Sequence, residues 1–170
     1  MNQLDSQAVA QMQRCFRPES AAIIGASTNP MKFGGRALKF CLERGYGGRL
    51  YPVNAKNDVV QGVPAFASVA DLPESPDIAV IAVPAPQVKE NLLAAAERGA
   101  KIAVVYGAQF AESGETGAAR QQELLDIARA HGMRMIGPNC MGVMSLVSCF
   151  VASFSTAPEH HNGNGWPDLG

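Results

Sequence analysis

The chain has 170 residues, 47% of them hydrophobic and 17% charged, with a formal net charge of −1, which suits a single globular domain with a sizeable core. A net charge near zero gives no electrostatic basis for binding nucleic acid or an anionic membrane surface. The sequence shows no signal-peptide pattern and no run of roughly 18 apolar residues that could span a membrane, so we expect a cytoplasmic protein.

The N-terminal segment has the pattern of an amphipathic helix. Apolar residues recur there every four positions, at Leu4, Ala8, Met12 and Phe16. This spacing predicts a helix over residues 4–15 that packs on the domain through its apolar stripe. Pro18 ends the helix before the first strand.

The rest of the chain is organised around a short strand and the loop of small and polar residues that follows it. Residues 21–24 are apolar, as in a buried strand, the loop covers residues 25–30, and a helix opens near Gly34 or Gly35. Small residues let backbone N–H groups approach a ligand, and a helix N-terminus carries partial positive charge, so the arrangement suits a phosphate group. The alternative interpretation is an ordinary strand-to-helix connection.

Strands and helices alternate along the remaining sequence. Further strands are expected at residues 49–53, 77–83, 101–106 and 134–136, and Pro52 is expected to end its strand or bulge it. Helices are expected from Gly34 to near Gly45, with Leu38 and Leu42 on the buried face, and over residues 86–98 and 115–131. Such alternation forms right-handed βαβ units. The sequence therefore predicts an α/β fold with a Rossmann-like, doubly wound parallel sheet and helices on both faces.

This organisation divides the chain into three parts. Residues 1–18 form an N-terminal helix packed on the domain, and residues 19–147 form the Rossmann-like domain. Residues 148–170 are polar and rich in glycine and proline, so we expect a linker or tail, or the truncated start of a second domain. Residues 151–154 are the one candidate strand in that last part.

Two loops bear on the choice of ligand, because a doubly wound sheet binds ligands at the carboxyl ends of its strands. Proteins of this type that bind NAD usually carry Gly-x-Gly in the first loop and an acidic residue at the tip of the second strand. This chain has Gly25-Ala26-Ser27 in the first place and Asn54-Ala55-Lys56 in the second. Lys56 would favour a phosphorylated ribose, so NAD is disfavoured, while NADP and coenzyme A stay open. The alternative interpretation of Lys56 is a solvated loop lysine.

Five motifs occur together, in an order and at a spacing that resemble a known family. They are Cys15-Phe16-Arg17-Pro18-Glu19-Ser20, Ile23-Ile24-Gly25-Ala26-Ser27, Tyr51-Pro52-Val53-Asn54, Ala82-Val83-Pro84-Ala85 and Gly137-Pro138-Asn139-Cys140-Met141-Gly142. The set resembles the CoA-binding domain of the NDP-forming acyl-CoA synthetases, which include the succinyl-CoA synthetase α-subunit. The resemblance runs from about Phe16 to Val143.

The resemblance implies which residues contact the phosphates of coenzyme A. Gly25, Ala26, Ser27 and Thr28 would hold them through backbone and hydroxyl groups. Lys56 takes the position of a CoA-contacting lysine.

The resemblance also implies contacts along the rest of the coenzyme. Val83 and Pro84 are expected against the adenine or pantetheine arm. Tyr106, Gly107 and Ala108 are expected in a further contacting loop. Asn139 and Cys140 would lie near the thiol. No His or Asp neighbours Cys140 in sequence to lower its pKa, so we expect a structural or CoA-proximal thiol rather than a catalytic nucleophile. The four cysteines lack CxxC or metal-finger spacing, so we expect neither a metal site nor a disulfide framework.

The family's reaction, as the resemblance implies, converts an acid, CoA and a nucleoside triphosphate into an acyl-CoA through an acyl phosphate. The phosphohistidine and ATP-grasp parts that this reaction needs are not recognised in this sequence. We therefore expect the chain alone to bind CoA or acyl-CoA, with missing ligase domains or an ATP-grasp subunit as partners. The alternatives are a stand-alone CoA-sensing or regulatory module and an NADP-binding Rossmann protein.

Overall fold

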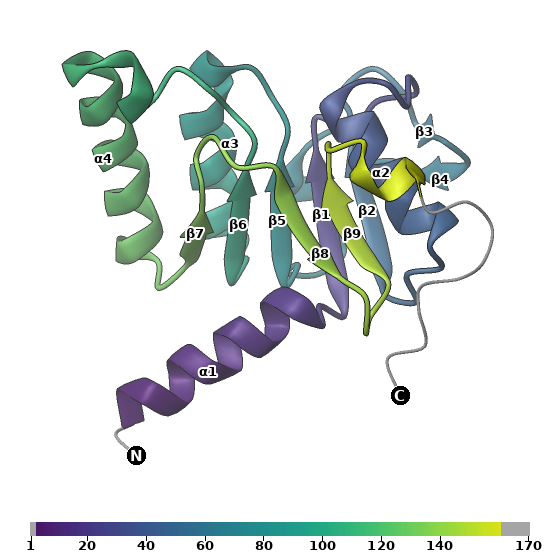
Figure 1. Ribbon diagram of the computed structural model, residues 1–170, viewed down its shortest axis with the longest axis horizontal. Helices are drawn as coiled ribbons and strands as arrows, with labels where there is room; N and C mark the ends of the chain where they lie inside the picture. The colour runs from purple at the N-terminus through teal and green to yellow at the C-terminus, as the bar shows by residue number, and fades with distance from the viewer. Residues whose placement is uncertain (1–2, 161–170) are drawn as a thin grey trace.

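The structure is a computed structural model that describes residues 3–160. Its centre is a sheet of five parallel strands in the order β2-β1-β5-β6-β7 (Figure 1). The strands are β1 (Ser20–Ile24), β2 (Arg49–Val53), β5 (Ile78–Ile81), β6 (Ile102–Val105) and β7 (Arg134–Ile136). The chain runs from β1 outward to β2, then crosses back to β5 and proceeds the other way. This order is that of a doubly wound sheet, and the predicted Rossmann-like fold is confirmed.

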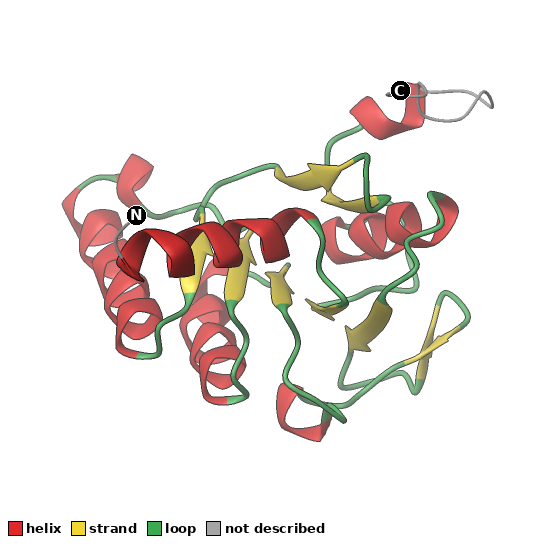
Figure 2. Cartoon of the chain, turned by 90° about the horizontal axis from the view of Figure 1, so that it is seen from below, coloured by secondary structure: helices red, strands yellow, loops and turns green. Residues whose placement is uncertain are grey.

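Helices cover both faces of this sheet. Helices α1 (Gln3–Phe16) and α2 (Phe33–Glu43) lie on one face, and α3 (Ala85–Glu97) and α4 (Glu115–Ala130) lie on the other. Figure 2 shows α1 and α2 on the opposite side of the strands from α3. The bounds of α3 and α4 agree with the predicted helices to within a residue or so at each end.

The central strands are apolar along their whole length because both of their faces are buried. In β1, Ala21 and Ile23 pack toward α2, whereas Ala22 and Ile24 pack toward α3. Strands β5 and β6 have the same alternation and are fully buried. Such unbroken apolar runs are typical of parallel strands between two helical layers.

Smaller elements fill the connections. The short strands are β3 (Val59–Val60), β4 (Val63–Pro64), β8 (Gly142–Ser145) and β9 (Phe150–Ser153), and the 3-10 turns are η1 (Val69–Asp71), η2 (Ala111–Ser113) and η3 (Ala157–His160). The turn η1 lies between β4 and β5. Ser68 and Asp71 form a reciprocal capping box there.

The hairpin β8–β9 joins the core on the α2 side. All four residues of β9 are buried, and Phe150 contacts the ring of Tyr46 with ring centroids 5.1 Å apart. The boundary expected at residue 147 falls between the two strands of this hairpin. Residues 150–153 therefore pack with the sheet and α2, although their sequence neighbours are polar.

Three local predictions were wrong. Met12 and Phe16 are 45% and 46% exposed, and Cys15 is the buried residue of this part of α1; the structure does not describe the side chains of Leu4 and Ala8. Leu42 is also exposed. Strand β2 continues in register through Pro52, because β2 is an edge strand and proline is tolerated there.

Candidate functional site

A groove crosses the carboxyl ends of the central strands, where the loops after β1, β2, β5 and β6 meet. It consists of two adjoining hollows of about 720 and 460 Å³. Both hollows are lined by Gly25, Lys32, Ala82, Val83 and Pro84. The strand order reverses between β1 and β5, so the groove lies at the topological switch point, the usual ligand position in such sheets.

The two hollows differ in their walls. Ala26, Ser27 and Lys56 line the hollow on the β2 side. Phe33 and the segment Tyr106–Ala108 line the hollow on the β6 side. The groove thus runs from a polar end with a lysine to an end with aromatic and small residues.

Three glycines let the loop after β1 pack closely against its neighbours. A Cβ atom on Gly34 would lie 2.2 Å from the carbonyl oxygen of Gly25, and one on Gly35 would lie 2.0 Å from that of Asn29. Gly25 has a φ of +82° and approaches the backbone of Ala82. Side chains would prevent these contacts, so the loop depends on glycine at all three positions.

Side-chain amides from neighbouring loops bond to the carbonyl oxygens of this loop. Asn54 donates to the carbonyl of Ala26 over 2.8 Å, and Gln61 donates to those of Ser27 and Gly35 at the same distance. The backbone N–H groups of Ser27 and Thr28 have no hydrogen-bond acceptor among residues 3–160. Helix α2 begins directly after this loop and has no side-chain cap. The loop therefore presents donors that suit an anion.

Most of the sequence-predicted residues gather along the groove. Those that line it are Gly25, Ala26, Ser27, Lys56, Val83, Pro84, Tyr106, Gly107 and Ala108. Thr28 is exposed beside the loop and does not line either hollow.

Asn139 and Cys140 also lie outside the lining, although they are adjacent to its β6 end. The backbone N–H of Asn139 donates to the carbonyl of Gly107 over 2.7 Å. The thiol of Cys140 lies 3.4 Å from the carbonyl oxygen of Val105. Burial raises the pKa of the Cys140 thiol, which favours an unreactive thiol over a nucleophile.

Tyr106 forms part of the floor of the groove at the end of β6. Its ring meets that of Phe154 edge-on with centroids 5.1 Å apart, and Phe154 in turn stacks on Phe33 at 4.3 Å. The Tyr106 hydroxyl is buried and has no hydrogen-bond partner among the described residues. Burial raises its pKa far above the usual range. The side chain is thus a neutral, structural phenol and cannot act as an acid or base near neutral pH.

Sequence reasoning missed Asn54, Gln61 and Lys32 as parts of this site. Asn54 was visible as a polar residue at a strand tip, which is a usual position for a ligand contact. Gln61 had no comparable signal, since its partner residues are distant in the sequence. Lys32 lines both hollows and was hidden among ordinary loop residues.

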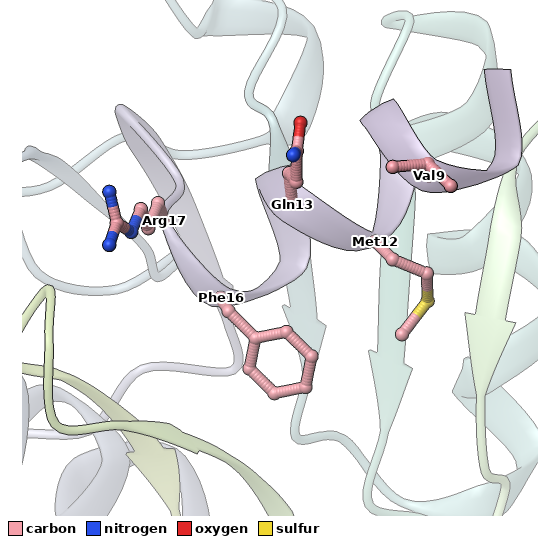
Figure 3. A pocket seen from close by; sticks show the side chains of 5 residues that line it. All are labelled: Val9, Met12, Gln13, Phe16 and Arg17. Atoms are coloured by element: carbon pink, nitrogen blue, oxygen red, sulfur yellow. The ribbon is translucent and has the colours of Figure 1, made fainter. Parts of the chain in front are cut away.

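A separate hollow of about 790 Å³ lies along α1, lined by Val9, Met12, Gln13, Phe16 and Arg17 (Figure 3). This hollow lies at the amino ends of the strands, and the groove lies at their carboxyl ends. Gln11 and Arg14 of α1 contact Gly132 and Asp77, which precede β7 and β5. Figure 1 shows α1 at the end of the strands away from the loop between β1 and α2. The α1 hollow therefore forms no part of the groove.

Neither a metal centre nor a membrane segment is found in the part of the chain that the structure describes. No group of three or more His, Cys, Asp or Glu side chains is placed there to hold a metal ion. None of the described helices combines the length and the apolar content needed to cross a membrane.

The chain is similar to several known proteins. The family described as the CoA binding domain matches residues 19–145. The α-subunit of acetate–CoA ligase [ADP-forming] II from Pyrococcus furiosus is 42% identical over 147 residues, which is 86% of this chain and 32% of that protein. Acetate–CoA ligase [ADP-forming] II from Archaeoglobus fulgidus is 36% identical over 92% of this chain and 23% of its own length.

A solved structure supports the fold. It is the dinucleotide forming acetyl-coenzyme A synthetase 1 of Ca. Korarchaeum cryptofilum, in complex with phosphate and ADP. The match has a TM-score of 0.81 and 34% identity, and it covers 84% of this chain and 30% of that one. The chain therefore spans about a third or less of the length of these similar proteins.

Proposed function

The chain belongs to the CoA binding domain family, and on this premise we propose that its groove binds coenzyme A in an extended form. The phosphates lie against the loop of Gly25–Thr28, beside Lys56. The pantetheine arm follows the hollow along Val83 and Pro84 toward Gly107. The thiol end lies near Asn139.

The observation that carries this proposal is the loop between β1 and α2. The N–H groups of Ser27 and Thr28 have no acceptor among the described residues, and the uncapped N-terminus of α2 adds partial positive charge. Lys32 and Lys56 line the same hollow. Backbone donors, a helix N-terminus and lysines together favour a phosphate-bearing ligand.

The remainder of the groove suits an extended, weakly polar arm. Val83, Pro84 and Ala108 line the β6-side hollow, and their small or rigid side chains leave backbone groups accessible. The backbone bond from Asn139 to Gly107 brings the loop after β7 to the end of this hollow. A pantetheine arm carries amides that pair with such backbone groups, and its methylenes can lie on the apolar wall.

We also propose that the chain supplies the CoA-binding part of an NDP-forming acyl-CoA synthetase. Such an enzyme joins an acid to CoA at the expense of a nucleoside triphosphate, and two of the proteins similar to this chain bear names of that kind. Here the chain's residues hold CoA and direct its thiol toward the acyl group. The groups that activate the acid come from other domains or a partner subunit.

The test is a calorimetric titration of the chain with CoA, NADP and NAD. We expect CoA to bind most tightly. The tip of β2 carries Lys56 and no carboxylate that would read an unphosphorylated ribose, which disfavours NAD, and membership of the CoA binding domain family favours CoA over NADP. Tighter binding of NADP than of CoA would refute the proposal. A lack of binding by all three ligands would refute it as well.

A further inference from the structure

The turn between β3 and β4 carries an unusual residue at its first position. Gln61 and Gly62 both have positive φ values, +50° and +82°, as in the two-residue hairpin turns that favour Asn-Gly. A glutamine is rarely found in this left-handed conformation. Turn geometry alone would thus favour asparagine at position 61, so the extra methylene of glutamine calls for another explanation.

The side chain of Gln61 reaches out of its own turn and joins both ends of the loop between β1 and α2. Its Nε2 donates to the carbonyl oxygens of Ser27 and Gly35, each at 2.8 Å. The amide nitrogen carries two hydrogens, so both are used. The side chain is half-buried against the loop.

These bonds fix the direction of a donor that the proposed phosphate site needs. In a trans peptide the C=O of one residue and the N–H of the next belong to one plane and point in opposite directions. Holding the Ser27 carbonyl toward Gln61 therefore turns the Thr28 N–H away from the β3–β4 turn. Asn54 has the same relation to the preceding peptide, since it holds the carbonyl of Ala26.

We propose that Gln61 is a positioning residue, which holds the loop from Ser27 to Gly35 in the conformation that binds phosphate. This inference rests on the proposed function, because the loop is taken as the phosphate site of CoA. Gln61 itself contacts no phosphate. It acts through the backbone of Ser27 and Gly35.

The experiment compares Gln61→Asn with the parent chain of residues 1–170. Asparagine suits the turn better than glutamine, but it is one methylene too short to reach both carbonyls. The matched control is Gln11→Asn, which shortens an amide that donates to the carbonyl of Gly132 over 3.0 Å. This bond lies at the amino ends of the strands, away from the groove. The measurements are the CoA dissociation constant, the thermal midpoint, and backbone amide order parameters of residues 26–35 without ligand.

We expect Gln61→Asn to weaken CoA binding about tenfold, because binding must then order the loop that the two hydrogen bonds hold in the parent, while its thermal midpoint changes little, since the better turn residue offsets the lost bonds. The order parameters of the ligand-free loop should fall from the range of rigid backbone toward that of flexible segments. Gln11→Asn should leave CoA affinity and the loop order parameters unchanged. Gln61→Met, which keeps the side-chain length but donates no hydrogen bond, should reproduce the loss of CoA affinity and of loop order, with a thermal midpoint below that of Gln61→Asn because methionine lacks asparagine's preference for this turn.

The inference is overturned if Gln61→Asn and Gln61→Met bind CoA within about twofold of the parent, a difference well below that of one hydrogen bond. It is also overturned if the ligand-free loop keeps its order parameters in both variants, because Gln61 would then be a turn residue only. Failure of the parent chain itself to bind CoA would refute the proposed function. In that case the order parameters still decide whether Gln61 fixes the loop.

Discussion

The side-chain amide of Asn54 donates to the carbonyl oxygen of Ala26 over 2.8 Å and so joins the tip of β2 to the loop after β1. Its Oδ1 accepts hydrogen bonds from the backbone N–H groups of Lys56 and Asn57, at 2.8 and 3.0 Å. One asparagine thus sets the backbone of both loops that form the polar end of the groove. The position of Lys56 relative to the proposed phosphate site follows from this contact.

The first prediction concerns Lys56. Replacement by alanine should weaken CoA binding by about 1 kcal/mol, or roughly fivefold, as expected for an exposed ionic contact. The affinity of the parent chain should also fall more steeply with salt than that of Lys56→Ala, because the variant has lost a screened charge. Calorimetry at two salt concentrations measures both effects.

The control for Lys56 is Lys101→Ala. It removes an exposed lysine at the amino end of β6, away from the groove at the carboxyl ends of the strands. Its CoA affinity should equal that of the parent. Equal affinities for Lys56→Ala and Lys101→Ala would show that Lys56 is a solvated loop lysine.

The second prediction concerns Ser27, whose hydroxyl oxygen accepts a hydrogen bond from the N–H of Asn29 over 3.1 Å. Ser27→Asp should lower CoA affinity by at least about tenfold, since a charge-assisted hydrogen bond is worth about 1.5–3 kcal/mol and like-charge repulsion adds to the loss. The thermal midpoint should change little, because Ser27 lies outside both core clusters. Titration calorimetry and thermal unfolding provide the two values.

Ser27→Asn is the neutral counterpart of that change, with a similar shape and no charge. We expect it to bind CoA more tightly than Ser27→Asp. If Ser27→Asp kept the parent's affinity, the loop would lie outside the CoA site.

The third prediction concerns the close packing of α2 on the loop. A Cβ on Gly34 would lie 2.2 Å from the carbonyl oxygen and 2.8 Å from the carbonyl carbon of Gly25. Gly34→Ala should therefore displace the loop or the helix and cost about 1–3 kcal/mol in the free energy of unfolding. It should also weaken CoA binding. Gly47→Ala is the control, because a Cβ there meets nothing within 4 Å; parent-like stability of Gly34→Ala would contradict the packing argument.

The fourth prediction tests the contribution of β9 to the core. Phe150 is fully buried on the α2 side, so Phe150→Ala should reduce the free energy of unfolding by about 3–5 kcal/mol. Val147, in the turn of the same hairpin, is exposed, and Val147→Ala should change stability by less than about 0.5 kcal/mol. Urea unfolding distinguishes the two. A small effect of Phe150→Ala would mean that the hairpin is dispensable to the fold.

The fifth prediction concerns alkaline pH and Cys41, which is fully buried in α2. Burial raises the pKa of its thiol from 9.0 to about 12. Between these values the unfolded chain loses a proton that the folded chain keeps, so stability is complete below about pH 9 and declines as the pH rises toward 12. The decline from this group is at most about 1.4 kcal/mol per pH unit.

Urea unfolding of the parent and Cys41→Ala between pH 8 and pH 11 measures this decline, at pH values on both sides of the free thiol's pKa. Cys41→Ala should be less stable at pH 8 and should lose stability less steeply above pH 9. Identical slopes for the parent and Cys41→Ala would contradict the prediction.

Much of the fold could be predicted from the sequence because the pattern is local. Strand β5 is apolar at every position, and α3 and α4 have start and stop signals at their ends. The order of these elements implies a parallel doubly wound sheet, since βαβ units have one hand. The same logic predicted that the loops after β1, β5 and β6 would share one edge of the sheet, as they do.

Other features were set by contacts between distant residues. Met12 and Phe16 fit a buried stripe by spacing, yet α1 packs with Cys15 buried and with Gln11 bonded to the distant carbonyl of Gly132. The candidate strand at residues 151–154 corresponds to β9. Its coverage by α2 could not be read from the pattern of residues 150–153.

The sequence by itself determined the strand–loop–helix unit around Gly25, because an apolar run, a glycine that permits positive φ and a helix start are all local signals. Only the tertiary structure decided which groups hold that loop. Gln61 lies far from Ser27 and Gly35 in the chain, and its two hydrogen bonds form only when the β3–β4 turn is placed beside α2. Side-chain amides can pair with any carbonyl within reach, and that reach is set by how the chain folds back on itself rather than by sequence spacing.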